Sequence, residues 1–167
     1  MRKIIEQIVN LDDLQLNELF DLSDVEITNG GFSCAHNNLT SLKGAPLKCK
    51  NMVRASYNNL TNLEYVPYCL NGYFEFGHNK ITSLENLPEI TGNLLFNNNR
   101  LESLKHAPRI INGGLYCHNN LLTSLEYCPQ LIKMSFYCQG NQLTSLEYGP
   151  KISKGSYCCS DNLLTSL

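Results

Sequence analysis

The sequence lacks an excess of charge of either sign and contains no long apolar run. Thirteen lysine and arginine residues face 15 aspartate and glutamate residues, so the formal net charge of the 167-residue chain is -2 and its pI is near 6.1. Because the charges are so evenly balanced, the chain has no general attraction for nucleic acid or for an anionic membrane surface. No apolar stretch approaches the ~18 residues of a membrane-spanning helix. We therefore expect no nucleic acid partner and no membrane partner.

The start of the chain lacks the features of a secretory signal peptide. Glu6 and Asn10 interrupt the apolar residues that follow "MRK", and no small-residue cleavage site comes after them. We therefore expect a cytoplasmic protein whose eight cysteines are reduced thiols. The number of cysteines then needs an explanation other than disulfide bonds.

Proline is scarce, and its placement reveals a repeat. The motif N-x-L-x-x-L recurs with spacings of 21, 21, 20, 21, 21 and 21 residues, and all six prolines follow the asparagine of a motif by nine residues. The asparagines are Asn37, Asn58, Asn79, Asn99, Asn120, Asn141 and Asn162. Copies at one period predict a repeat domain over residues 27–167 with seven repeats, the last one incomplete.

The residues before each asparagine show the period-two pattern of a strand. The positions five and three residues upstream of the asparagine are apolar and should face inward. The position five residues upstream holds Phe32, Val53, Phe74, Leu94, Leu115, Phe136 and Tyr157. The position three residues upstream holds Cys34, Ala55, Phe76, Phe96, Cys117, Cys138 and Cys159. A 21-residue unit is shorter than the ~30 residues of a strand–helix–strand unit. Proline also favours an extended or tightly turned return leg over a helix. The pattern predicts a β-solenoid whose strands, about five residues long, form one parallel sheet.

The recurring asparagines have the chemistry of a turn residue. The amide offers two donors and an acceptor, and asparagine tolerates left-handed backbone geometry. We predict that the seven asparagines stack as a structural ladder that satisfies peptide groups at the ends of the strands. The alternative is that they are exposed loop residues.

The repeats resemble a known family. The windows "FSCAHNNL", "VRASYNNL", "FEFGHNKI", "LLFNNNRL", "LYCHNNLL", "FYCQGNQL" and "YCCSDNLL" resemble the L-x-L-x-x-N-x-L core of leucine-rich repeat proteins, and "NNLTSLE" followed by proline is similar to short repeats of bacterial and bacteriophage proteins. The resemblance implies a parallel sheet on a concave face and an extended, turn-rich convex side. The sequence departs from the family pattern at two positions. A position upstream of the strand that holds leucine in the family is polar here, and the second inward strand position favours cysteine. We expect a thinner coil, or one closed differently on that side.

Residues 1–26 lie outside the period and predict a helical cap for the first coil. Asn10 and Asp13 resemble a capping pair, and apolar residues recur at helical spacing on both sides of them. These residues are Ile4, Ile5, Ile8, Leu11, Leu14, Leu19 and Phe20. The alternative is a helix on a membrane surface, which the acidic residues of "LDDLQLNELFD" oppose.

The sequence stops inside a repeat at Leu167. An exposed apolar end with an open sheet edge should pack against another surface, so we expect a homodimer through Leu163, Leu164 and Leu167. A truncated chain is the alternative explanation.

Cys117 and His118 invite a chemical interpretation, as a nucleophile with its base or as zinc ligands. Consecutive strand residues point to opposite faces, so these two side chains should not meet. Inward cysteines repeated at ~4.8 Å cannot converge on one tetrahedral ion. We therefore predict packing thiols, with no metal and no cofactor. Cys158, which should face outward, is the candidate for a reactive thiol.

The outward strand positions carry the predicted binding surface. Their only fixed charges are Arg54 and Glu75, too few to neutralise phosphates. Clustered tyrosines with polar neighbours are typical of protein interfaces. The predicted partner-binding residues are Arg54, Tyr73, Glu75, Leu95, Tyr116, His118, Tyr137, Gln139 and Cys158.

The function expected from these residues is a non-enzymatic protein–protein interaction module that binds its partner on the concave face. The similarity to bacteriophage repeats implies a phage-encoded inhibitor of a host or defence factor, acting in the host cytoplasm. One alternative is a homo-oligomerising structural protein. Another is a cysteine-dependent enzyme that uses Cys158 or His118. The tyrosines could also merely cover the sheet.

Overall fold

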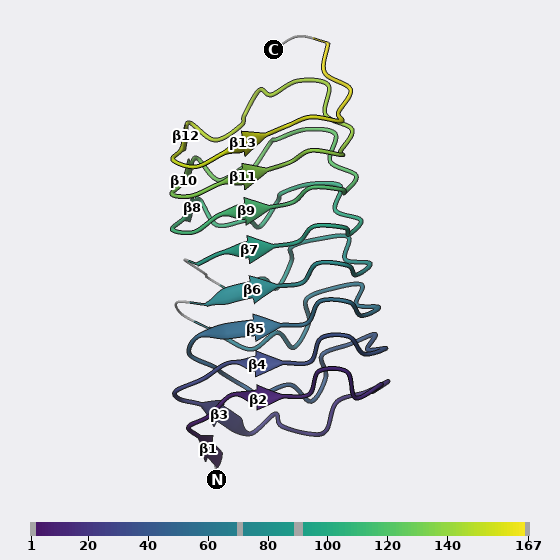
Figure 1. Ribbon diagram of the computed structural model, residues 1–167, viewed down its shortest axis with the longest axis vertical. Helices are drawn as coiled ribbons and strands as arrows, with labels where there is room; N and C mark the ends of the chain where they lie inside the picture. Colours follow the sequence, from purple (N-terminus) through teal and green to yellow (C-terminus); the bar gives the residue numbers. More distant parts are fainter. Residues whose placement is uncertain (1–2, 70–71, 89–91, 166–167) are drawn as a thin grey trace.

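The chain folds into a nearly straight column of stacked coils (Figure 1), seen here in a computed structural model that describes residues 3–69, 72–88 and 92–165. Each coil adds one strand to a main parallel sheet of eight strands, ordered β13-β11-β9-β7-β6-β5-β4-β2 along the column. Successive strands pair in register one repeat apart, as in the pairing of Phe136 with Leu115. The fold is a parallel β-solenoid with a repeat of about 21 residues, which confirms the prediction from the repeat pattern.

The strands of the main sheet are two or three residues long, shorter than predicted, because the chain turns again within each coil. They are β2 (Val9–Asn10), β4 (Phe32–Ser33), β5 (Met52–Arg54), β6 (Tyr73–Glu75), β7 (Leu94–Leu95), β9 (Leu115–Tyr116), β11 (Phe136–Tyr137) and β13 (Tyr157–Cys158).

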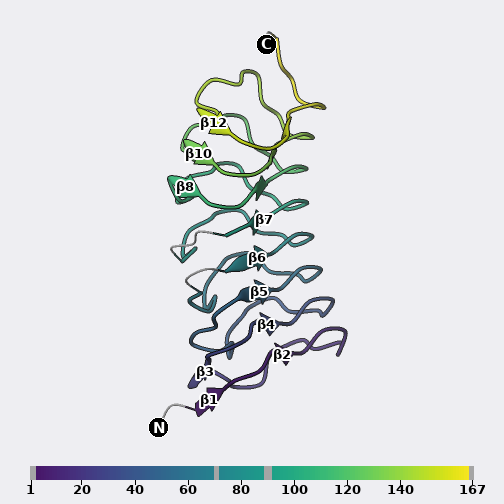
Figure 2. The same ribbon diagram turned by 60° about the vertical axis from the view of Figure 1, so that its left-hand side comes forward.

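A second parallel ladder, which the sequence pattern did not reveal, runs beside the main sheet (Figure 2). Its strands are β1 (Lys3–Ile5) paired with β3 (Val25–Ile27), and β8 (Ile110–Ile111), β10 (Leu131–Ile132) and β12 (Ile152–Ser153) in a three-stranded sheet. Single bridges from Glu26 to Lys48 and from Lys48 to Tyr68 continue the ladder along the column. Ile111 and Ile132 are fully buried here, so this ladder closes the side of the coil on which the family leucine is missing.

One continuous apolar core fills the column. The inward positions of the main sheet are buried in every coil but the first and the last, and the rings of Phe74, Phe76 and Phe96 stack at centroid distances of 6.0 and 5.6 Å. All eight cysteines are free thiols, and Cys117 and Cys138 are fully buried among these apolar residues. A thiol suits this position because free cysteine packs as a small apolar side chain.

The recurring asparagines join each coil to the coil before it. Asn79 shows the pattern: its Nδ2 donates to Phe76 O (3.1 Å) in its own coil and to Ala55 O (2.9 Å) in the preceding coil. Its Oδ1 accepts the Leu60 N–H (3.0 Å), also from the preceding coil. The equivalent bonds recur at Asn37, Asn58, Asn99, Asn120, Asn141 and Asn162.

The left-handed backbone residue of each of these turns is the one before the ladder asparagine, rather than the asparagine itself. It is His36 (φ 54°) in the first repeat and Asp161 (φ 53°) in the last. The asparagine therefore serves through its amide group, and its neighbour makes the bend.

The predicted N-terminal helical cap is wrong, because residues 3–27 form strands β1, β2 and β3 instead. Val9 pairs with Phe32 in the main sheet, and the Leu16 N–H donates to Asn37 Oδ1 (2.8 Å), as the equivalent amides do in the repeats. The segment is thus a further coil without the asparagine motif. Short isolated helices are marginal in water, and here pairing with the next coil prevails over the helical spacing of the apolar residues. The described residues contain no helix of the length and hydropathy needed to cross a lipid bilayer.

Candidate functional site

The outward side of the main sheet, here called the sheet face, brings together the residues that the sequence singled out for binding. These residues extend from β5 to β13, and all nine are half-buried: Arg54, Tyr73, Glu75, Leu95, Tyr116, His118, Tyr137, Gln139 and Cys158. The face divides into a charged half, near the N-terminal coils, and an aromatic half, near the C-terminal coils.

The charged half is organised around Arg54. Its Nη1 donates to Asp12 Oδ2 at 3.3 Å, and its Nε lies 3.3 Å from Glu75 Oε2 as an ion-pair contact outside hydrogen-bond geometry. Ser56 Oγ donates to Glu75 Oε1 (3.2 Å). Burial, and then the nearby Glu75 carboxylate, raise the pKa of the Tyr73 phenol. The single cation of this half is therefore balanced by two carboxylates of the same chain.

Asp12 is the member of this network that sequence reasoning missed. Its Oδ1 accepts hydrogen bonds from Ser33 Oγ and from the Ala35 N–H, both at 2.6 Å. Ser33 and Ala35 lie at outward strand positions, which the alternation of strand residues predicts to be open, but both are buried next to the first coil. No sequence signal marked Asp12, because it lies in the segment that was interpreted as a helical cap.

The aromatic half is organised around Tyr116 and Tyr137. Their ring centroids lie 5.2 Å apart with the planes tilted by 57°, a geometry that aromatic pairs favour. Leu95 and Cys158 occupy the equivalent positions in the coils on either side, since Leu95 pairs with Tyr116 and Tyr137 with Cys158. The pair thus forms the centre of an apolar row across four coils.

Two polar atoms beside the tyrosine pair are buried without a hydrogen-bond partner among the described residues, His118 Nδ1 and Gln139 Oε1. Burial, and then the proximity of His78, lower the pKa of His118, so its ring is neutral at neutral pH. A buried polar atom without a partner costs about 1–3 kcal/mol. A molecule that supplied the missing hydrogen bonds would therefore be stabilised at this place.

The geometry keeps Cys117 and His118 apart, since Cys117 is fully buried in the core and His118 lies on the sheet face. Burial raises the pKa of the Cys117 thiol far above its usual value and raises the pKa of Cys128 and of Cys138 to about 12. Such thiols remain protonated and shielded. Cys158 is half-buried on the sheet face. Within residues 3–69, 72–88 and 92–165, no group of three or more histidine, cysteine or acidic side chains is placed to hold a metal ion.

Sequence reasoning also missed a row of stacked side chains at the turns that follow the strands of the main sheet. The rings of His36 and Tyr57 stack at 4.3 Å, and those of Tyr57 and His78 at 4.1 Å. Asn98 Nδ2 lies 3.2 Å from His78 Nε2, and Asn119 Nδ2 donates to Asn98 Oδ1 (3.0 Å). The signal was present in the sequence, because each of these residues directly precedes a ladder asparagine.

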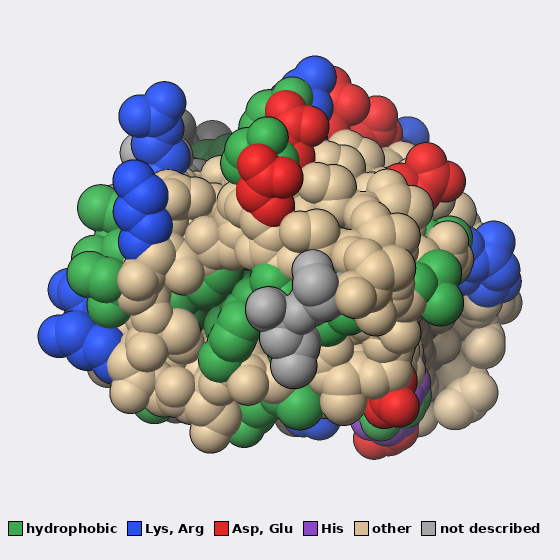
Figure 3. All heavy atoms as spheres, turned by 90° about the horizontal axis from the view of Figure 1, so that it is seen from above, with side chains coloured by type: hydrophobic (Ala, Val, Ile, Leu, Met, Phe, Trp, Pro, Cys, Tyr) green, Lys and Arg blue, Asp and Glu red, His purple; other side chains and the backbone are tan. Residues whose placement is uncertain are grey.

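The residues predicted for self-association lie at the C-terminal end of the column. Leu163 is 62% exposed, and Leu164 is half-buried against the core. Leu167 lies outside the described residues. Hydrophobic side chains gather near the middle of this end (Figure 3).

Comparison with known proteins assigns no family to the chain. A scan against models of protein families finds no match, and a search of curated proteins finds no relative. Inference about function therefore starts from the side chains of the sheet face.

Proposed function

We propose that the chain is a protein-binding module that docks a polypeptide on the sheet face. The observation that carries this proposal is the aromatic half, where the Tyr116–Tyr137 pair lies beside two buried polar atoms, His118 Nδ1 and Gln139 Oε1, that have no hydrogen-bond partner in the described part of the chain. Tyrosines that are half-buried and held in place by neighbouring coils lose little conformational freedom on binding. Such side chains dominate the energetics of many protein interfaces.

The chemistry of this surface suits a polypeptide better than a nucleic acid. An apolar side chain of the partner would pack on the two rings and on Leu95, while backbone N–H groups would supply donors for Gln139 Oε1. Nucleic acid needs several free cations, whereas Arg54 already lies against the carboxylates of Asp12 and Glu75.

The test is selection of a displayed library of random peptides against the full chain, followed by affinity measurements on the variant with both Tyr116→Ala and Tyr137→Ala. We expect selected peptides to lose affinity by about 1,000-fold, because two hot-spot truncations of ~2 kcal/mol each sum to ~4 kcal/mol. The control carries Tyr127→Asn and Tyr148→Asn, which remove two exposed tyrosines from adjacent coils away from the sheet face. Equal binding of the double alanine variant and the control would exclude the aromatic half as the binding site.

The repeat motif supports a further element of this proposal, that the chain is a leucine-rich repeat protein related to those of bacteria and bacteriophages. A phage-encoded module of this kind would block a host or defence factor in the host cytoplasm. Expression in bacteria that carry defence systems tests this idea, because the unmodified chain should restore phage growth and the double alanine variant should not.

Self-association through the last described coil is the second candidate. The exposed Leu163 side chain and the apolar end of the column favour it. Sedimentation of the full chain over a range of concentrations should then show a dimer that Leu163→Glu abolishes. A monomer at all concentrations would exclude this candidate.

A further inference from the structure

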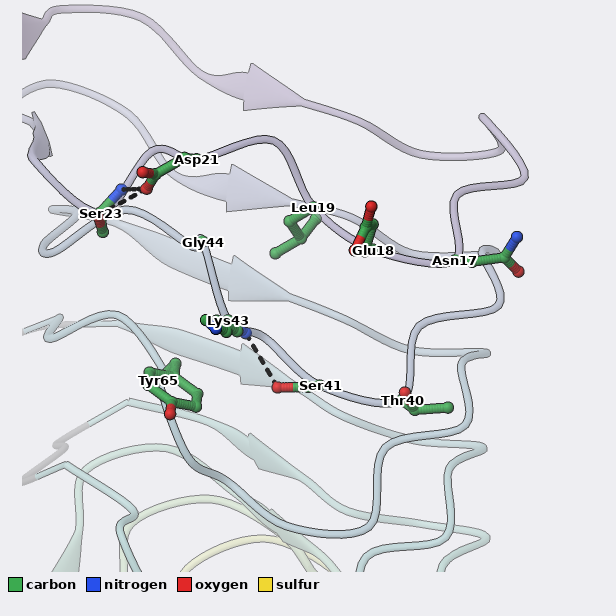
Figure 4. A pocket seen from close by; sticks show the side chains of 10 residues that line it. All are labelled: Asn17, Glu18, Leu19, Asp21, Ser23, Thr40, Ser41, Lys43, Gly44 and Tyr65. Atoms are coloured by element: carbon green, nitrogen blue, oxygen red, sulfur yellow. Dashed lines mark hydrogen bonds between the residues drawn. The ribbon is translucent and has the colours of Figure 1, made fainter.

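A groove lined by both polar and apolar groups lies on the side of the return legs, away from the sheet face (Figure 4). It measures about 640 Å³, which lies within the size range of small-molecule sites. Its lining comes from the return legs of the first and second coils, with one side chain from the third: Asn17, Glu18, Leu19, Asp21, Ser23, Thr40, Ser41, Lys43, Gly44 and Tyr65.

The groove exists because the first return leg is longer than the others. Leu16 and Leu39 occupy equivalent positions, since each donates its N–H to a ladder asparagine. Leu22 and Leu42 are also equivalent, since each carbonyl accepts the N–H of the residue three positions later. The first leg therefore spans six residue steps between these points (16 to 22) where the second spans three (39 to 42), a difference of three residues.

The longer leg is attached to the second coil at both of its ends. The Asn38 N–H donates to Leu16 O (2.8 Å), and the Leu22 N–H donates to Gly44 O (2.7 Å). Between these two bonds the first leg follows its own path. The groove is thus already formed before any ligand arrives.

Tyr65 provides an open aromatic surface in this groove. It stands at a left-handed position (φ 63°) that recurs along the column, and its side chain is 57% exposed. In the preceding coil the equivalent residue is Gly44 (φ 91°), which has no side chain to cover the ring. A Cβ at Gly44 would lie 2.9 Å from Phe20 O, so the longer leg itself requires glycine there.

The polar groups that line the groove include both donors and acceptors. Asp21 Oδ1 accepts from the Ser23 N–H (3.1 Å) and from Ser23 Oγ (2.6 Å), and these bonds lower the pKa of Asp21. The carboxylate is thus ionised and held in one orientation. Ser41 Oγ accepts the Lys43 N–H (3.1 Å), which leaves the Ser41 hydroxyl proton free to donate to a ligand.

We propose that this groove binds a hexopyranose ring, neutral or carrying an amino group, with one face of the sugar stacked on Tyr65. A pyranose offers an apolar face of C–H groups and a rim of hydroxyls, which matches a groove with one open aromatic ring at one end and carboxylate, hydroxyl and amide groups along its length (Figure 4). The groove lining contains two carboxylates, of Glu18 and Asp21, and one ammonium group, of Lys43. Its net charge is therefore negative, so an acidic sugar fits this groove poorly. The inference is independent of the proposed protein-binding role of the sheet face.

The test uses the full chain, labelled with ¹⁵N, and a panel of glucose, galactose, mannose, N-acetylglucosamine and glucosamine. We expect at least one sugar to cause saturable shifts of the Gly44 and Tyr65 amides at millimolar concentration. Tyr65→Asn should weaken this binding by about tenfold, because it removes the stacking surface. Asparagine suits the left-handed position, where Asn86 stands in the next coil (φ 65°), so the variant should fold.

The control is Tyr148→Asn, which changes the equivalent position of a distant coil (φ 64°) and should leave binding unchanged. Comparison of the free sugar with a glycan that ends in it identifies the source, since tighter binding of the glycan indicates a chain end and equal binding indicates the free sugar. No shift with any sugar up to ~50 mM would overturn the proposal. An equal loss of binding in both tyrosine variants would overturn it as well.

Discussion

Replacement of Asn79 by alanine tests the physical basis of the column, the hydrogen bonds from each asparagine to the preceding coil. The substitution removes the amide that donates to Ala55 O (2.9 Å) and Phe76 O (3.1 Å) and accepts from the Leu60 N–H (3.0 Å). Asn79 is only 9% exposed, so water does not easily replace these bonds. The Leu60 N–H is left without a partner in the interior, whereas Ala55 O still accepts from Asn58 Nδ2 (3.1 Å) and Phe76 O from Asn99 Nδ2 (2.9 Å).

The expected cost follows from one buried N–H without a partner and from two carbonyls that each lose one of their hydrogen bonds. The orphaned N–H costs about 1–3 kcal/mol and each lost bond to a carbonyl about 0.5–1.5 kcal/mol, so the free energy of unfolding should fall by about 2–6 kcal/mol. This loss is a large part of the free energy of unfolding of a typical domain, which is roughly 5–15 kcal/mol. Because coils interact mainly with their neighbours, the loss should be concentrated in the coils that contain Leu60 and Asn79.

Urea unfolding followed by circular dichroism measures the total loss, and native-state hydrogen exchange locates it. The Leu60 amide should exchange much faster in the variant, while amides in distant coils keep their protection. Asn38→Ala, at an exposed residue beside another ladder asparagine, is the matched control and should change stability by less than ~0.5 kcal/mol. If Asn79→Ala were no more destabilising than this control, the ladder would not hold the coils together.

Three further predictions concern the thiols and the charged half of the sheet face. The contribution of Cys128 and Cys138 to stability should be constant up to pH ~9 and fall toward pH ~12 by about 1.4 kcal/mol per pH unit per thiol, because both thiols ionise near 9 when unfolded but only at about 12 when folded. Urea unfolding against pH checks this slope, which alanine at both positions should reduce. Iodoacetamide at pH ~8 should label Cys158 before Cys138, as read by peptide mass spectrometry, because Cys158 is half-buried whereas Cys138 is buried in the folded chain; the reverse order would contradict the placement of these thiols. Asp12→Ala should lower the free energy of unfolding by about 2–4 kcal/mol through the loss of three hydrogen bonds, whereas Asp13→Asn should leave it within ~0.5 kcal/mol; equal effects in thermal or urea unfolding would argue against the network.

The repeat pattern predicted the parts of the fold in which every coil meets an equivalent neighbour. The period, the inward apolar columns and the buried position of Cys117 could all be read in this way. Each of these features follows from one alternation of side chains repeated at a fixed spacing. The nine residues predicted for binding also lie on one side of the main sheet, since the alternation of strand residues assigns them to that side.

The repeat pattern could not predict the second ladder or the structure of the first coil. Ile111 and Ile132 belong to strands of two residues, too short for a period-two pattern to be recognised. The first coil lacks the asparagine motif, and its apolar residues happen to follow a helical spacing. Its true state depends on pairing with β4, a contact between residues about 20 positions apart that local patterns do not encode.

The sequence by itself determined that the chain winds into similar coils and which side chains each coil turns inward, because those preferences repeat with every copy of the motif. Only the tertiary structure decided what happens where the copies differ. It placed Asp12 and Glu75 against Arg54, left one atom each of His118 and Gln139 without a hydrogen-bond partner among the residues described, and opened the groove beside Tyr65. These contacts join side chains of different coils that occur once rather than periodically, so their positions emerge only when the coils are stacked.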